Sequence, residues 1–130
     1  MMKLGYIGIL GTPYSIHMQT ESENPKLKTA YGLCETYAKK IVLLDDEPSD
    51  NVTDDNFMYY ENYVEFKTKS LRHEIVHAFL AESGLRNNSE WAENEEMVDW
   101  VAIQIEKMYP VMQQAEKLLM EHERQKESDD

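Results

Sequence analysis

LRHEIVHAFLAESG, residues 71–84, is the most informative stretch of this sequence. Apolar residues occupy nearly every side of it, which is typical of a helix that is buried all round. Gly84 suits the left-handed residue that commonly ends a helix. We therefore expect one helix from about residue 56 to residue 83, with a break near 67–70.

His73 and His77 lie four residues apart in this helix, and Glu74 directly follows the first histidine. Positions i and i+4 share a helix face with Cβ atoms about 5–6 Å apart, so two imidazoles can direct nitrogens at one ion. Glu74 sits about 100° further round, where it can reach a water on that ion without being a ligand. Burying these groups without partners would cost roughly 1–3 kcal/mol each, and a metal removes that cost.

A third ligand is needed, because a catalytic zinc site takes three protein ligands and keeps one open position. The metzincin pattern HExxHxxGxxH does not fit, since Leu80 and Ser83 occupy its glycine and histidine positions. A glutamate on a following helix is the other source. Glu93, Glu95 and Glu96 compete for this role, and Glu95 and Glu96 differ by about 100° in direction, so both cannot face the metal equally.

Residues 94–99 read NEEMVD, so Asn94, Glu95 and Asp99 match the pattern Asn-Glu-x-x-x-Asp. With HEIVH, this pattern resembles the gluzincin branch of zinc peptidases, the thermolysin-like group, over about residues 70–103. The resemblance implies that Glu95 is the third zinc ligand and that Asp99 hydrogen-bonds a ligating histidine. Asp99 lies one turn after Glu95, and metal-bound histidines usually donate their other N–H to a carboxylate or carbonyl.

The chain departs from the large gluzincins in length. It lacks their C-terminal domain, which supplies a histidine that stabilises the transition state. In extent it is similar to the minimal zinc-peptidase-like proteins of phages and mobile elements, which keep the sheet, the active-site helix and the ligand helix. The residue that would stabilise an oxyanion therefore stays open, and the candidates are His17, Tyr37, Tyr59, Tyr60 and Tyr63.

Strand patterns fill the first half of the chain and helical patterns the second. This order predicts an α+β, zincin-like fold, with a small, mostly antiparallel sheet packed on the HExxH helix and on a following ligand-bearing helix. The expected strands cover residues 3–10, 14–20, 30–35 and 39–44, with the last two forming a hairpin. The strand at 30–35 would be an edge that can pair with an extended peptide.

The remaining helical segments are predicted from the residues that can begin or interrupt a helix. Ser89 can cap a second helix that runs to about Tyr109, and Pro110 should kink this helix or open a third. A chain of 130 residues suits one domain. We expect a single zincin-like domain over residues 1–120 and a polar, frayed tail over 121–130.

The composition indicates which classes of partner and which cellular compartment are expected. The net charge of −12 disfavours both nucleic acid and anionic membrane surfaces as partners, because each is bound through Lys and Arg. Cys34 is the single cysteine, so no internal disulfide can form, which fits a reducing compartment. No stretch approaches the roughly 20 apolar residues of a membrane span, and the cytoplasm is the expected location.

Taken together, these features predict a zinc-dependent peptidase acting on a peptide or protein substrate. In that reading zinc lowers the pKa of a water toward ~7 and polarises the carbonyl oxygen, and Glu74 is the general base. Two alternatives stand beside it. One is a zinc-containing interaction module that binds a partner protein and cleaves nothing, and the other is a metal-free helical scaffold with a fortuitous motif.

Overall fold

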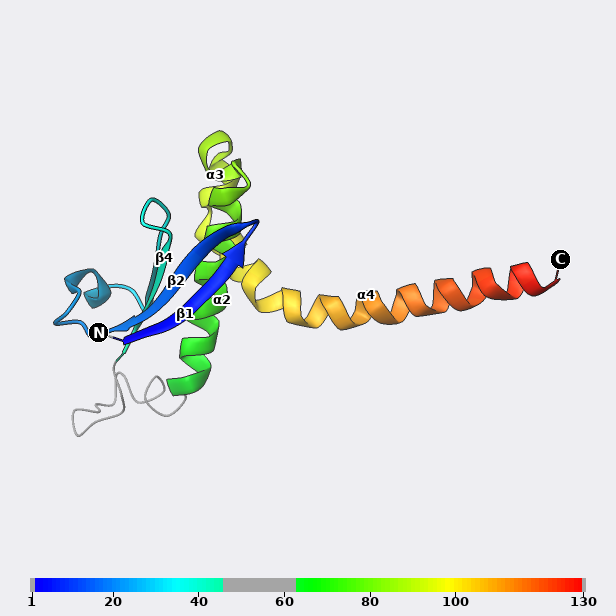
Figure 1. Cartoon of the computed structure of the whole chain (residues 1–130), viewed down its shortest axis with the longest axis horizontal. Coiled ribbons are helices and arrows are strands. Elements are labelled where there is room, and N and C mark those ends of the chain that lie inside the picture. The colour runs from blue at the N-terminus through cyan, green and yellow to red at the C-terminus, as the bar shows by residue number, and fades with distance from the viewer. Residues whose placement is uncertain (1, 46–62, 130) are drawn as a thin grey trace.

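The computed structural model describes residues 2–45 and 63–129. One four-stranded sheet packs against a long helix, and the last helix projects away from this domain (Figure 1). The α+β class predicted from the sequence is confirmed. The elements in chain order are β1 (Met2–Ile9), β2 (Thr12–Gln19), the short 3-10 turn η1 (Pro25–Lys28), β3 (Gly32–Glu35), β4 (Lys40–Leu44), α2 (Tyr63–Glu82), α3 (Leu85–Asn88), η2 (Glu90–Glu93) and α4 (Glu95–Asp129).

The sheet has the strand order β1-β2-β4-β3. β1 pairs with β2 in the antiparallel sense, and β3 pairs with β4 in the same sense, as expected for the predicted hairpin of residues 30–44. β2 and β4 run parallel, however, so the sheet is mixed rather than uniformly antiparallel. β3 is an outer strand, as the sequence predicted.

Burial of β4 explains this arrangement. All four residues from Ile41 to Leu44 are at most 7% exposed, so both faces of this strand are covered. A strand that is apolar on both faces belongs inside a sheet. The more polar arm of the hairpin is left outside, and β4 meets β2 in the parallel direction.

Two apolar clusters hold the sheet. The larger one lies between the sheet and α2 and contains Tyr14, Ile16 and Met18, which alternate along β2 and share one of its faces. The smaller one lies on the opposite face, where Leu27 of η1 covers Val42. Burial of apolar surface of this kind is the main favourable contribution to folding.

α2 differs from the sequence expectation in two ways. It is continuous from Tyr63 to Glu82, without the break expected near 67–70, while the expected start at residues 56–62 lies outside the described residues. It is also less buried than predicted, since Phe79 is 42% exposed on the side away from the sheet. Gly84 follows the helix with φ +85°, the left-handed conformation that was predicted for it.

α4 runs as one helix of 35 residues through Pro110, so no third helix begins there. Proline removes one backbone hydrogen bond and is tolerated where water can satisfy the freed carbonyl, and this stretch of α4 is exposed. The polar segment expected to fray is part of the same helix up to Asp129. Within the described ranges, no helix is both long enough and apolar enough to cross a membrane.

The end of α2 is tied to both hairpin turns through Glu82. Its carboxylate accepts hydrogen bonds from the hydroxyl of Tyr14 at 2.6 Å and from Thr12 Oγ1 at 3.2 Å. The ammonium of Lys39 lies 2.5 Å from the same carboxylate. Burial, and then the bond to Glu82, raise the pKa of the Tyr14 hydroxyl above its usual range. This side chain is fully buried, so its hydroxyl depends on that one acceptor.

We expect Tyr14→Phe to lower the free energy of unfolding by about 1–2 kcal/mol, because it removes a buried hydrogen bond to a charged acceptor. Urea unfolding followed by circular dichroism measures the change. Tyr37→Phe is the matched control, because Tyr37 is fully exposed and should unfold at the wild-type midpoint. Equal midpoints for Tyr14→Phe and wild type would contradict the role assigned to this bond.

Candidate functional site

The two histidines of the HExxH motif converge as their helical spacing predicted. His73 Nε2 and His77 Nε2 lie 3.0 Å apart, with the imidazole planes at 72° to one another. Each side chain is less than one fifth exposed. Two ring nitrogens therefore point at the same small volume beside α2.

Glu95 closes the third side of this volume. Its Oε2 lies 2.9 Å from His73 Nε2 and its Oε1 lies 3.2 Å from His77 Nε2. It is the first residue of α4. The carboxamide oxygen of Asn94 accepts a hydrogen bond from the backbone N–H of Met97 at 2.9 Å, which caps the helix and fixes where Glu95 emerges.

Asp99 lies one helical turn after Glu95 and contacts the other nitrogen of the same histidine. Its Oδ1 is 2.6 Å from His73 Nδ1. A carboxylate can only accept here, so His73 donates from Nδ1, and in the neutral ring Nε2 then carries a lone pair. Asp99 therefore turns the lone pair of His73 toward Glu95 and His77.

This geometry places electron-rich atoms close together at the centre of the site, where a proton or a cation would stabilise them. A neutral His73 would place its Nε2 lone pair 2.9 Å from a carboxylate oxygen, which is repulsive unless a proton or cation lies between them. Ligands about 2.0–2.1 Å from a tetrahedral zinc are separated by about 3.3 Å. The three distances among Nε2 of His73, Nε2 of His77 and the Glu95 oxygens are between 2.9 and 3.2 Å. The donor set thus fits a cation of this kind.

Glu74 is placed differently from Glu95. It is only 7% exposed, and its Oε1 lies 4.0 Å from His73 Nε2. His73, Glu74 and His77 also form a group close enough to hold a metal ion. The oxygens of Glu95 lie closer to both imidazoles than Glu74 Oε1 lies to His73. The carboxylate of Glu74 lies beside the two imidazoles.

Burial raises the pKa of Glu74 to about 7; the charge of His73 opposes this rise, and the charges of Glu95 and Asp99 add to it. A carboxyl group in this range can exchange a proton at neutral pH. Burial also lowers the pKa of His77, which favours the neutral imidazole that a metal requires. The shift at His77 thus favours the form that can bind a metal, and the shift at Glu74 brings its proton exchange close to neutral pH.

β3 passes directly over Glu74. A Cβ atom at Gly32 would lie 3.2 Å from Glu74 Cγ and 3.3 Å from the backbone oxygen of Val42. Both distances are tighter than an ordinary contact, so the absence of a side chain at this position lets the strand approach the helix. The outer strand is thereby held against the site.

The site opens into a cleft of about 570 Å³. Residues 30–34 form one wall, α2 forms the floor, and the start of α4 contributes Glu95 and Asp99. Lys69 and Arg86 also line the cleft. Sequence reasoning did not single out these two cations. Lys69 lies four residues before His73, and Arg86 lies two residues after Gly84. This proximity to the motif was the one signal in the sequence that could have suggested them.

The two rival ligands and two of the proposed oxyanion donors lie outside the cleft. Glu96 is exposed and does not line the cleft, and Glu93 faces Arg86 at 3.9 Å. Among the candidates for oxyanion stabilisation, His17 and Tyr37 do not line the cleft. Tyr59 and Tyr60 lie outside the described residues, as does the side chain of Tyr63.

Cys34 lines the cleft without being suited to act as a nucleophile. Burial, followed by the charge of Glu74, raises the pKa of its thiol to about 12. The thiolate is the reactive form, so this cysteine should be inert at neutral pH.

We expect iodoacetamide to label Cys34 at pH 8 at least about a hundredfold more slowly than it labels glutathione, because the raised pKa leaves little thiolate. Labelling should keep accelerating as the pH rises past 9, and it should reach the glutathione rate in concentrated urea. Mass spectrometry of timed samples measures the rate. Labelling of the folded protein at the glutathione rate would contradict this environment.

No protein-family model, curated protein or solved structure matches this chain significantly.

Proposed function

We propose that this protein is a zinc-dependent peptidase in which His73, His77 and Glu95 hold the metal. The observation that carries the proposal is the meeting of two imidazole nitrogens and the Glu95 carboxylate within 3.2 Å of one another. Asp99 supports it by orienting His73 from behind. Outer carboxylates of this kind orient the ligands of natural zinc sites.

The choice of zinc follows from the donor set. Two neutral imidazoles and one carboxylate suit zinc and neighbouring transition metals, whereas calcium and magnesium prefer oxygen ligands alone. Three protein ligands leave a fourth position open, which is the arrangement of catalytic rather than structural zinc. When bound, zinc would lower the pKa of a water and polarise a substrate carbonyl.

Glu74 is the proposed general base. It takes a proton from the attacking water and passes it to the leaving amine as the peptide bond breaks. Its burial supports this role, because a carboxyl group with a pKa of about 7 both accepts and releases protons near neutrality. Lys69 and Arg86 give the cleft two positive charges that can meet substrate oxygens.

The position of β3 supports an extended peptide as substrate. It is an outer strand of the sheet, and residues 30–34 form one wall of the cleft. Its hydrogen bonds to β4 use one of its two edges. A peptide adding to the other edge would run across Glu74 and the two histidines, because main-chain pairing aligns an extended chain with an edge strand.

A zinc-containing module that binds a partner protein without cleaving it is the second candidate. It is favoured by the placement of His17 and Tyr37 outside the cleft, because neither of them can stabilise an oxyanion there. The two candidates share the metal site and differ in the role of Glu74. Substitution at that one residue therefore separates them.

Elemental analysis of the purified chain should find one zinc per molecule. Glu95→Gln should weaken zinc binding by at least about tenfold, and Asp99→Asn by about 10–100-fold, as for other residues that support a ligand. Competition with a chelator of known affinity measures both. Glu96→Gln is the matched control and should bind zinc like wild type. Loss of zinc in the control but not in Glu95→Gln would reverse the assignment of the third ligand.

Replacing Glu74 with Gln should abolish peptide cleavage while leaving one zinc per chain. The amide keeps the shape of the side chain but cannot accept the proton of the water. Incubation with a mixed peptide library and mass spectrometry of the products measures cleavage. Activity in Glu74→Gln would refute the proposed base, and a zinc-loaded wild type that cleaves no peptide would favour the binding module.

A further inference from the structure

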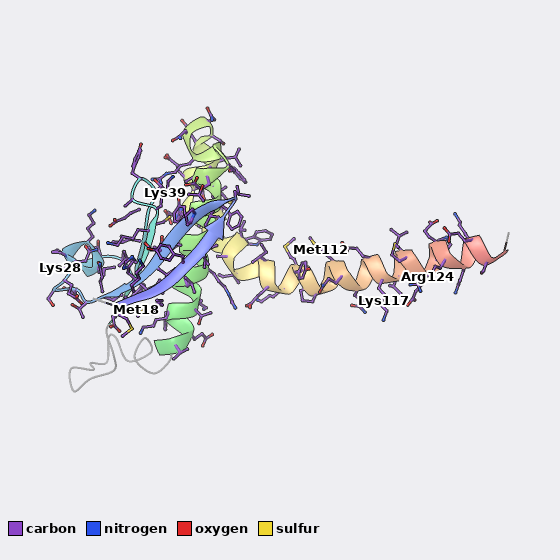
Figure 2. All side chains as sticks on the ribbon, viewed as in Figure 1. Met18, Lys28, Lys39, Met112, Lys117 and Arg124 are labelled. Carbon is purple, nitrogen blue, oxygen red and sulfur yellow. The ribbon has the colours of Figure 1, made fainter. Side chains whose placement is uncertain are left out.

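The projecting half of α4 carries an apolar stripe that nothing in the described part of the chain covers. The stripe consists of Ile105, Met108, Met112, Ala115 and Leu119, all exposed. Their spacings alternate between three and four residues, which keeps them on one side of a helix. Figure 2 shows Met112 and Lys117 on opposite sides of the projecting helix, as this spacing requires.

The stripe is too large to be an incidental feature of a monomer. Two further apolar residues flank it, Val111 and Leu118, each 64% exposed. Together these side chains expose several hundred Å² of apolar surface, more than most monomers leave in one patch and close to the roughly 800 Å² that each partner buries in a standard interface. A helix that projects alone gains little stability in water, because helices depend on packing of an apolar face.

We propose that the stripe pairs with the same stripe of a second copy of this chain, with the two helices antiparallel. Four of the five stripe residues pair with one another in this orientation. Met112 lies opposite the partner's Ala115, a large residue against a small one, and Met108 lies opposite the partner's Leu119. Val111 then lies near the partner's Leu118, which covers the flanking apolar residues as well.

The parallel orientation is disfavoured by charge and by shape. It would place Val111 beside the partner's Glu116 and Leu118 beside the partner's Glu123, so apolar side chains would meet carboxylates.

Val98 and Ala102, on the same side of α4 as the stripe, are buried where the helix packs on α2. A parallel partner would bring its own domain to that side at the same level. The antiparallel arrangement puts the two domains at opposite ends, as the projection of α4 in Figure 1 allows.

The test is the mass of the full chain in solution, measured by sedimentation equilibrium at about 100 µM and at lower concentrations. We expect twice the chain mass of 15.3 kDa. Met112→Glu should raise the dissociation constant at least about a hundredfold, because the dimer would bury an unpaired charge. Lys117→Glu, on the opposite side of the helix, is the matched control and should remain dimeric. Slow labelling of Cys34 in Met112→Glu shows that its domain is folded.

Single added cysteines test the orientation. A mixture of Met108→Cys and Leu119→Cys chains should form a disulfide between the two variants under mild oxidation, and Leu119→Cys alone should not crosslink to itself. A monomeric wild type would overturn the proposal, as would a Met112→Glu chain that dimerises as tightly as the control. Self-crosslinking of Leu119→Cys would overturn the antiparallel arrangement.

Discussion

The packing of the start of α4 across α2 is the constraint on which the site depends. Two histidines on one helix define a direction, but the site exists only because Asp99 and Glu95 reach His73 from a second helix at 2.6 and 2.9 Å. The apolar part of the same contact is made by Val98 and Ala102, which are both buried. Val98 lies between Glu95 and Asp99 in the sequence. One helical turn of α4 thus supplies both the packing that fixes the crossing and the carboxylates that use it.

The sheet shapes the cleft and buries Glu74, whereas the metal-ligating candidates come from the helices. Its buried central strand, β4, forces the other arm of the hairpin to the outside, and that arm becomes a wall of the cleft. Gly32 lets β3 approach so closely that Glu74 is shielded from water by the strand above it. Burial then raises the pKa of Glu74 toward neutrality. The order of the strands is therefore connected, through burial, to the acid–base properties of the site.

α4 serves two parts of the molecule at once. Its first turn carries residues of the site, and its middle turns, over residues 105–119, carry the apolar stripe on the part that projects from the domain (Figure 1). The stripe lies on the side of the helix that packs on α2, so the same periodicity serves the intramolecular contact and then continues beyond it. Such continuity is expected when one helix belongs both to a domain core and to an interface between chains.

Local periodicity was enough for the sequence to determine His73, Glu74 and His77 as a group, because helical spacing places i and i+4 together whatever the rest of the chain does. The same holds for the shared face of Glu95 and Asp99. Tertiary structure decided the features that depend on contacts between distant parts of the chain. It selected Glu95 over the neighbouring Glu96, since only the crossing of α2 and α4 determines which carboxylate faces the imidazoles. It also set β2 parallel to β4 and brought Arg86 into the cleft, because strand order and cleft walls arise from contacts between residues that are distant in sequence.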